Sequence, residues 1–223
     1  MDLNQLIPAL TINALPVLFA ITVHEAAHGY AARHFGDNTA WAMGRVTLNP
    51  MKHIDPMGTI LIPLLLMLVN APFLFGYAKP VPVRFGNLRN PKRDMVWVAL
   101  AGPGANLAQA WIWGVLLYLL VGAGVGESTP FFGEMCQAGI KWNVLLFAFN
   151  LFPLPPLDGG RILVGLLPYN ASVTVSRLEP WGFFIVLGLA YVGIIDAMWM
   201  EPLRSVTYGL LNVLLLPFSW LAR

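Results

Sequence analysis

The sequence His24-Glu25-Ala26-Ala27-His28 closes an N-terminal stretch, residues 3–23 (LNQLIPALTINALPVLFAITV), that carries no charge. On a helix, the H-E-x-x-H pattern places two imidazoles on one face, where both can bind one Zn²⁺. Glu25 lies beside the first imidazole, close enough to activate a water at that metal. The pattern and its apolar surroundings predict hydrolysis at a metal site inside a membrane or at its edge.

The composition of the chain is that of a membrane protein. Of its 223 residues, 57% are apolar and 11% are charged, whereas roughly a quarter of the residues are charged in soluble proteins. The mean hydropathy is +0.67. A helix needs about 20 apolar residues to cross a bilayer, and most of the charge-free runs approach or exceed that length. These runs are residues 3–23, 56–78, 95–126, 142–157, 180–195 and 205–222.

These runs predict a single integral membrane domain over residues 1–223, an all-α polytopic helical bundle. Its core would cover about residues 3–167, and two additional helices would lie within residues 177–222. Residues 127–141, between two of the runs, are expected to form a polar loop. A net charge of +2 is too small to indicate nucleic acid as a partner.

Two segments depart from the pattern of spanning helices. Residues 39–49 contain β-favouring residues around Gly44 and stop at Pro50, which predicts a short interfacial strand or hairpin. Residues 56–78 are apolar but contain an Asn-Ala-Pro break and lead into Lys79-Pro80-Val81-Pro82-Val83, which cannot be helical. This second pattern favours a re-entrant segment buried in protein.

A catalytic zinc generally takes three protein ligands and keeps one position open, so His24 and His28 need a partner. The candidates are His34, His53 and Asp158. Asp158 is flanked by apolar residues and glycines deep in the chain, and an ionisable side chain at membrane depth is costly unless it has a function. The alternative for Asp158 is a helix cap after a proline turn. His53 either lies near the catalytic mouth or is a polar residue of an interfacial loop.

The motifs together resemble the site-2 protease family of intramembrane zinc metalloproteases, in its compact prokaryotic branch without PDZ or CBS domains. The resemblance covers about residues 10–170. It rests on H-E-x-x-H and on a downstream N-x-x-P-x-P-x-L-D-G-G element at residues 150–160. It extends to GRVTLNP at residues 44–50, KPVPV at residues 79–83 and AGPGAN at residues 101–106.

The resemblance implies roles for individual residues. His24, His28 and Asp158 would bind one Zn²⁺ per chain, and Glu25 would be the general base. Asn150 would steady the substrate carbonyl or the oxyanion that develops from it. The alternative for Asn150 is a hydrogen bond between helices, which intramembrane asparagines often make.

Substrate binding is expected beside the metal. A peptide bond inside a helix is shielded from attack, so a transmembrane substrate must unwind, and an exposed strand edge can then hold it by β-addition. The predicted strand supplies the candidates Gly44, Arg45, Val46, Thr47, Leu48 and Asn49. A plain interfacial hairpin is the alternative. Asn106 is a further candidate for substrate binding, although its Ala-Gly-Pro-Gly surroundings favour a structural role in helix packing.

The proposed ligands constrain the topology. If every apolar run crossed the bilayer, His24 and Asp158 would lie near opposite surfaces, because a helix rises 1.5 Å per residue. A re-entrant segment at residues 56–78 removes this conflict. It also gathers the basic residues on one side, which the positive-inside rule makes cytoplasmic: Arg33, Arg45, Lys52, Lys79, Arg84, Arg89, Lys92 and Arg93. We therefore predict a multi-pass protein of the inner, cytoplasmic membrane, with five crossings, one re-entrant segment and the zinc toward the cytoplasm.

Three functions are compatible with these features. The first is an intramembrane zinc metalloendopeptidase that hydrolyses peptide bonds in or near transmembrane segments of membrane proteins. The second is a non-catalytic, metal-binding membrane scaffold, which has no need of Glu25. The third is a transporter with an ion site at Asp158, which requires a repeat or paired broken helices that the sequence does not contain. The first is favoured, with a transmembrane protein substrate and the lipid bilayer as partners.

Overall fold

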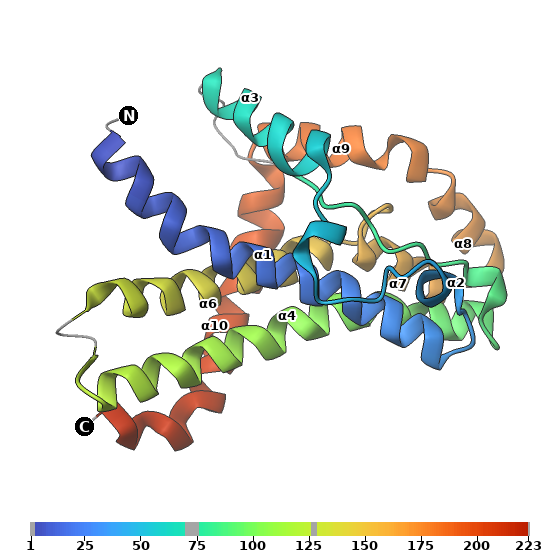
Figure 1. Cartoon of the computed structure of the whole chain (residues 1–223). Coiled ribbons are helices and arrows are strands. Elements are labelled where there is room, and N and C mark those ends of the chain that lie inside the picture. The colour runs from blue at the N-terminus through green and yellow to red at the C-terminus, as the bar shows by residue number, and fades with distance from the viewer. Residues whose placement is uncertain (1–2, 70–75, 126–128, 223) are drawn as a thin grey trace.

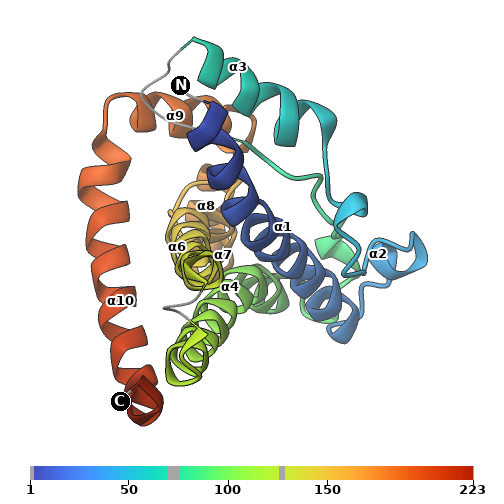
Figure 2. The same cartoon turned by 60° about the vertical axis from the view of Figure 1, so that its left-hand side comes forward.

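A computed structural model describes residues 3–69, 76–125 and 129–222. Three long helices form its centre, namely α1 (Leu3–His34), α4 (Pro91–Gly122) and α6 (Pro130–Asn150). Figures 1 and 2 show these helices side by side, with α10 (Glu201–Leu215) crossing α4 and α6. The predicted all-α character is confirmed for the described residues, which contain no β-strand.

The remaining elements are short. The α-helices are α2 (Thr39–Ala42), α3 (Ile62–Leu68), α7 (Asp158–Leu166), α8 (Tyr169–Ser176) and α9 (Glu179–Tyr191). The 3₁₀ helices are η1 (Pro50–Lys52), η3 (Phe85–Asn87) and η5 (Leu216–Ala222), and the π-helical turns are η2 (Pro56–Leu61) and η4 (Asp196–Met200).

Two described helices are long and apolar enough to cross a membrane, namely Leu10–His34 within α1 and the whole of α4. Helices α8 and α9 would form a third span if they are taken together across their 66° bend. The membrane character of the fold is therefore supported, whereas the predicted five crossings stay a prediction.

The polar loop expected at residues 127–141 is wrong for its described part, because α6 begins at Pro130. Proline is favoured at the first helical position, where its missing N–H has no intrahelical partner to lose. Glu134 and Lys141 are exposed on this helix, so their charges do not oppose its formation. At its other end, α6 stops before the prolines at 153, 155 and 156, which cannot continue a helix.

The strand or hairpin predicted at residues 39–49 is not confirmed. Residues 39–42 form α2, and residues 45–49 form an irregular turn. Local hydrogen bonds occupy the backbone: Arg45 N–H donates to Ala40 O at 2.9 Å, and Asn49 N–H donates to Thr47 Oγ1 at 3.1 Å. β-propensity expresses fit to a pleated neighbour, and this segment has no neighbouring strand within the described chain.

The described part of residues 56–78 turns back on itself as a re-entrant segment would, but the prediction that it is buried in protein is wrong, because Leu64, Leu65 and Leu68 of α3 are 50%, 49% and 69% exposed. It enters through η2 and α3, and the chain then returns to where it started, since Tyr77 N–H donates to Gly58 O at 3.0 Å. Thr59 Oγ1 also donates to Tyr77 O at 2.9 Å. The predicted Asn70-Ala71-Pro72 break lies outside the described residues.

Small residues let the central helices approach closely. Ala110 on α4 and Val144 on α6 are fully buried beside Leu211 of α10. A Cβ at Gly114 would lie 2.5 Å from a methyl of Leu215. Such contacts drive helix association in membranes, where there is no hydrophobic gain between apolar helices.

A buried carboxylate fixes the end of α1 to the loop before α4. Asp37 is fully buried and accepts hydrogen bonds from Arg84 N–H at 2.7 Å and from Asn87 Nδ2 at 3.1 Å. Burial on its own would raise the pKa of Asp37, but these bonds and those from Thr39 stabilise the carboxylate and hold its pKa below the ordinary value.

Candidate metal centre

The structure brings His24, His28 and Asp158 together. The two histidines lie one turn apart on α1, and Asp158 is the first residue of α7. Their Nε2 atoms are 3.0 Å apart, and each lies 3.2 Å from Asp158 Oδ2. All three residues are at most 9% exposed. They form the group predicted as ligands and are the only such group found in the described part of the chain.

Hydrogen bonds at the far side of each neutral imidazole place its proton on Nδ1 and leave the metal-facing Nε2 unprotonated. His28 Nδ1 donates to the backbone carbonyl of Val98 at 2.7 Å, and His24 Nδ1 donates to Asn106 Oδ1 at 2.6 Å. Both Nε2 atoms therefore present lone pairs. Asp158 Oδ2 is buried, and its polar neighbours in the described structure are these two Nε2 atoms.

Three potential ligand atoms thus converge, and with both imidazoles neutral and protonated on Nδ1 they offer three lone pairs to a cation. A tetrahedral zinc with bonds of about 2.0–2.1 Å has ligand atoms about 3.3–3.4 Å apart. The observed separations of 3.0–3.2 Å agree with that edge to within a few tenths of an ångström. Two nitrogens and one carboxylate oxygen are also a donor set of catalytic zinc sites, so the residues fit this metal.

The loop between α6 and α7 aims Asp158 at the histidines by folding tightly against the start of α7. A Cβ at Gly159 would lie 2.1 Å from Leu151 O, and one at Gly160 would lie 2.0 Å from Pro155 N. Neither approach is possible with a side chain. The N-cap residue of α7 is Leu157, and no side chain makes a capping hydrogen bond there. The geometry therefore argues against the alternative in which Asp158 serves as the helix cap.

Glycine on α4 makes room for the imidazoles. A Cβ at Gly102 would lie 2.4 Å from His28 Nε2 and 2.6 Å from His24 Cε1. The α4 backbone itself therefore forms one wall of the site. This gives a physical reason for glycine in the Ala-Gly-Pro-Gly segment.

Glu25 is held by the extended segment at residues 79–83. Its Oε2 accepts a hydrogen bond from Val81 N–H at 2.6 Å. Pro80 and Pro82 have no N–H, so Val81 carries the only backbone donor between them. Arg45 Nη2 donates to Lys79 O at 3.0 Å and to Pro80 O at 3.3 Å. These bonds place the predicted substrate-binding segment, residues 44–49, beside the extended segment at residues 79–83.

The other histidines lie elsewhere. His34 is exposed at the end of α1 and packs edge-on against Phe35. His53 is 2% exposed, and its Nε2 interacts with Thr47 O at 2.9 Å. Neither belongs to the metal group, so the geometry favours Asp158 as the third ligand.

The three asparagines near the site have different surroundings. Asn150 is partly exposed, and its Nδ2 donates to Leu146 O within α6 at 3.0 Å. No hydrogen bond within the described structure links it to the ligands, so its catalytic role stays a prediction. Asn106 is fully buried and bonds His24 from inside the protein, which argues against contact with substrate. Asn143 was missed, although an asparagine within the apolar sequence of α6 was a signal for it.

The fold and the site together define a helical, membrane-type metalloprotein with the donor set and the adjacent glutamate of a hydrolytic zinc site. The side chains that make up this site come from segments more than a hundred residues apart. No family model and no solved structure matches the chain.

Several curated proteins match it over most of its length. YwhC of Bacillus subtilis (strain 168) is 42% identical over 212 residues, which cover 93% of this chain and 88% of that protein. Rip2 of Mycolicibacterium smegmatis is 28% identical over 193 residues, covering 82% and 68%. MJ0611 of Methanocaldococcus jannaschii is 27% identical over 152 residues, covering 68% and 69%. All three carry the name "Putative zinc metalloprotease". The chain belongs to this site-2 protease-like family.

Proposed function

We propose that this chain is an intramembrane zinc metalloendopeptidase that hydrolyses peptide bonds in or near transmembrane segments of membrane proteins. The observation that carries the proposal is the convergence of His24, His28 and Asp158 beside Glu25, at a helix apolar enough to cross a membrane. The names of the relatives support metalloprotease activity.

Each residue of the site has a chemical task in this proposal. His24 and His28 hold the metal through Nε2, and Asp158 holds it through Oδ2. When bound, zinc polarises the substrate carbonyl and lowers the pKa of water at the site. Glu25 takes the proton of the attacking water and later passes it to the leaving amine. Val81 N–H occupies Glu25 Oε2, so Oε1 is the oxygen that exchanges protons.

The substrate would be held as an unwound segment. The extended chain at residues 79–83 runs past Glu25, and residues 44–49 lie against it. We propose that the substrate backbone pairs with this irregular, partly exposed region. Asn150, at the end of α6, is proposed to donate from its amide to the oxyanion.

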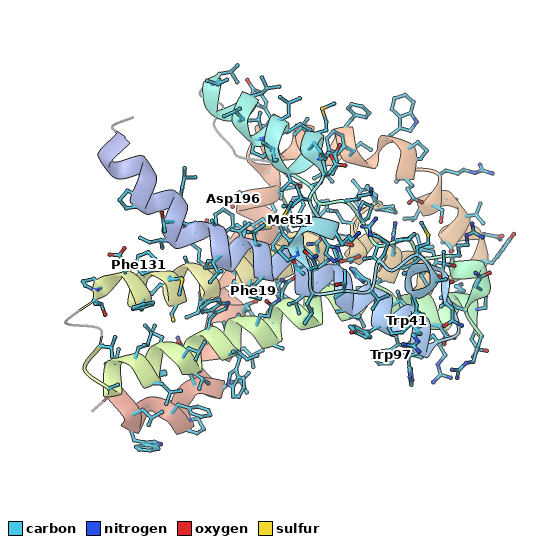
Figure 3. All side chains as sticks on the ribbon, in the orientation of Figure 1. Phe19, Trp41, Met51, Trp97, Phe131 and Asp196 are labelled. Atoms are coloured by element: carbon cyan, nitrogen blue, oxygen red, sulfur yellow. The ribbon has the colours of Figure 1, made fainter. Side chains whose placement is uncertain are left out.

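We propose a multi-pass location in the cytoplasmic membrane, with the active site toward the cytoplasm. Trp41 and Trp97 are 46% and 53% exposed, and Figure 3 shows both at one end of the molecule, opposite Phe131. Arg33 lies 3.5 Å above the Trp41 ring. Exposed tryptophan among basic residues is typical of a cytoplasmic membrane interface.

The test is cleavage of a reporter whose single transmembrane segment joins two detectable tags, reconstituted in vesicles with the zinc-loaded protein. Glu25→Gln is expected to abolish cleavage while zinc content stays at the wild-type level, because Glu25 is not a ligand. Glu134→Gln, an exposed residue far along α6 from the site, is the matched control and should cleave normally. Equal cleavage by Glu25→Gln and the wild type would reject the mechanism, and zinc binding without any cleavage would favour the scaffold.

A further inference from the structure

The two metal-binding imidazoles differ in what fixes their protons. His28 Nδ1 faces the backbone carbonyl of Val98, which can only accept a hydrogen bond. His24 Nδ1 faces the side-chain amide of Asn106, and an amide can present either its oxygen or its nitrogen. The proton position on His24 therefore depends on which way the Asn106 amide is turned.

A second set of contacts fixes the orientation of Asn106. Its Nδ2 lies 3.1 Å from Ala20 O on α1 and 2.9 Å from Asn143 Oδ1 on α6. Because the Ala20 carbonyl is only an acceptor, the amide nitrogen must face it. The Asn106 oxygen is then left to accept from His24 Nδ1.

The orientation of Asn143 is fixed in the same way. Its Nδ2 lies 2.9 Å from Gly139 O, one turn back on α6. That carbonyl also only accepts, so Asn143 must turn its oxygen toward Asn106. All the bonds of this chain therefore run in one direction, from His24 Nδ1–H through the two amides to backbone carbonyls.

Burial makes the direction hard to reverse. Both asparagines are fully buried, so water cannot replace a lost partner. Turning either amide would place two acceptors, or two donors, face to face in a medium of low dielectric, where such contacts are most costly. The chain also joins α1, α4 and α6, so the packing of these helices holds it in place.

We infer that Asn106 and Asn143 form a positioning relay that keeps His24 in the Nδ1–H tautomer, with the Nε2 lone pair directed at the metal. The inference rests on the metal site of the proposed function. It gives zinc affinity a dependence on Asn143, which touches no ligand, and it assigns Asn106 to the metal rather than to the substrate.

The test is the zinc dissociation constant of the purified full-length protein, measured by competition with a chromophoric chelator. Asn106→Leu removes the acceptor for His24 and should weaken zinc binding about 10–100-fold, as for other groups that orient metal ligands. Asn143→Leu should weaken it several-fold, since only Ala20 O then orients Asn106. Gln109→Leu is the matched control: Gln109 lies one turn along α4, its Nε2 is buried without a partner in the described structure, and zinc binding should not change.

Asn106→Asp separates the relay from a merely structural role. The aspartate still accepts from His24 Nδ1, so zinc affinity should stay within a few-fold of the wild type. It also faces Ala20 O and Asn143 Oδ1 with an acceptor, so the thermal unfolding temperature should fall. A structural role alone would lower zinc affinity and stability together.

Three results would overturn the relay: wild-type zinc affinity in Asn106→Leu, equal affinities of Asn143→Leu and Gln109→Leu, or equal weakening by Asp and Leu at position 106. If Asn106→Leu does not fold, the comparison of Asn143→Leu with Gln109→Leu decides. A wild-type protein that binds zinc but cleaves nothing would remove the proposed protease function and leave the relay standing.

Discussion

Alanine at position 102 is expected to disrupt the metal centre by steric contact alone. The added Cβ would lie 2.4 Å from His28 Nε2 and 2.6 Å from carbon atoms of both imidazoles. Ordinary contacts between such atoms are about 3.5 Å or longer, so the rings or α4 must move by roughly 1 Å. A metal site tolerates deviations of only about 0.2 Å from the usual metal–ligand distances.

The size of the effect follows from these distances. Losing a group that merely orients a ligand weakens metal binding about 10–100-fold, and here the ligands themselves are displaced. Zinc affinity of Gly102→Ala should therefore fall at least about 100-fold, or about 2.7 kcal/mol. Chelator competition measures this change directly. Thermal unfolding of the zinc-free protein checks that the helix has not been lost, since alanine is about 0.5–1 kcal/mol better than glycine in a helix interior.

Gly104→Ala is the matched control. Gly104 lies two residues further along α4, and a Cβ there would meet nothing within 4 Å. The variant should bind zinc like the wild type and unfold at a slightly higher temperature. If Gly102→Ala and Gly104→Ala bind zinc equally tightly, the close approach of α4 to the imidazoles is not a feature of the protein in solution.

Three further predictions concern other parts of the site. Asp158→Ala should lose zinc in metal analysis while His53→Ala keeps it, and full occupancy in Asp158→Ala would exclude that carboxylate as a ligand. Val81→Pro removes the N–H bonded to Glu25, so reporter cleavage should slow about tenfold or more at unchanged zinc content. Val81→Ala keeps the N–H and should cleave normally. If Val81→Pro cleaved the reporter as fast as Val81→Ala, the N–H of residue 81 would have no role in cleavage. The lowered pKa of Asp37 stabilises the fold above the ordinary carboxyl pKa, and this stabilisation is lost as pH falls through the lowered value. Asp37→Asn should therefore unfold at a lower temperature than the wild type at pH 7 and show a smaller drop on acidification, whereas parallel pH profiles would contradict the assignment.

Local periodicity and charge made much of the site predictable from the sequence. The spacing of His24 and His28 fixes their common face on any helix, whatever the rest of the fold. Asp158 was one of three candidates for the third ligand, because a lone acid between apolar residues and glycines needs a partner, and the resemblance to the site-2 protease family implied it over His34 and His53. The pairing of Asn106 with Asn143 could not be predicted from the sequence, because these residues are 37 positions apart and on different helices. Their partners are defined only when α1, α4 and α6 pack together.

The errors in the fold have a similar origin. The strand expected at residues 39–49 followed from residue preference, but a strand also needs a neighbour, and here the backbone groups bond locally. The start of α6 was placed too late because Glu134 and Lys141 interrupt the apolar run. A helix tolerates such charges wherever one face stays exposed, and apolar runs alone do not show which residues face outward.

The surroundings of Asp158 differ from those of Asp37, the other buried carboxylate discussed above, and they fit a cation site. A buried carboxylate is tolerated when it accepts several hydrogen bonds or faces a cation. Asp37 satisfies the first condition, with donors from Thr39, Arg84 and Asn87. In the described structure the polar neighbours of Asp158 Oδ2 are the two imidazole Nε2 atoms, each at 3.2 Å, so Asp158 meets the second condition when the histidines are protonated or when a metal ion lies between the three side chains. The hydrogen bonds of His24 Nδ1 and His28 Nδ1 on the far side of each ring turn both Nε2 atoms toward Asp158, which positions all three side chains to hold one metal ion.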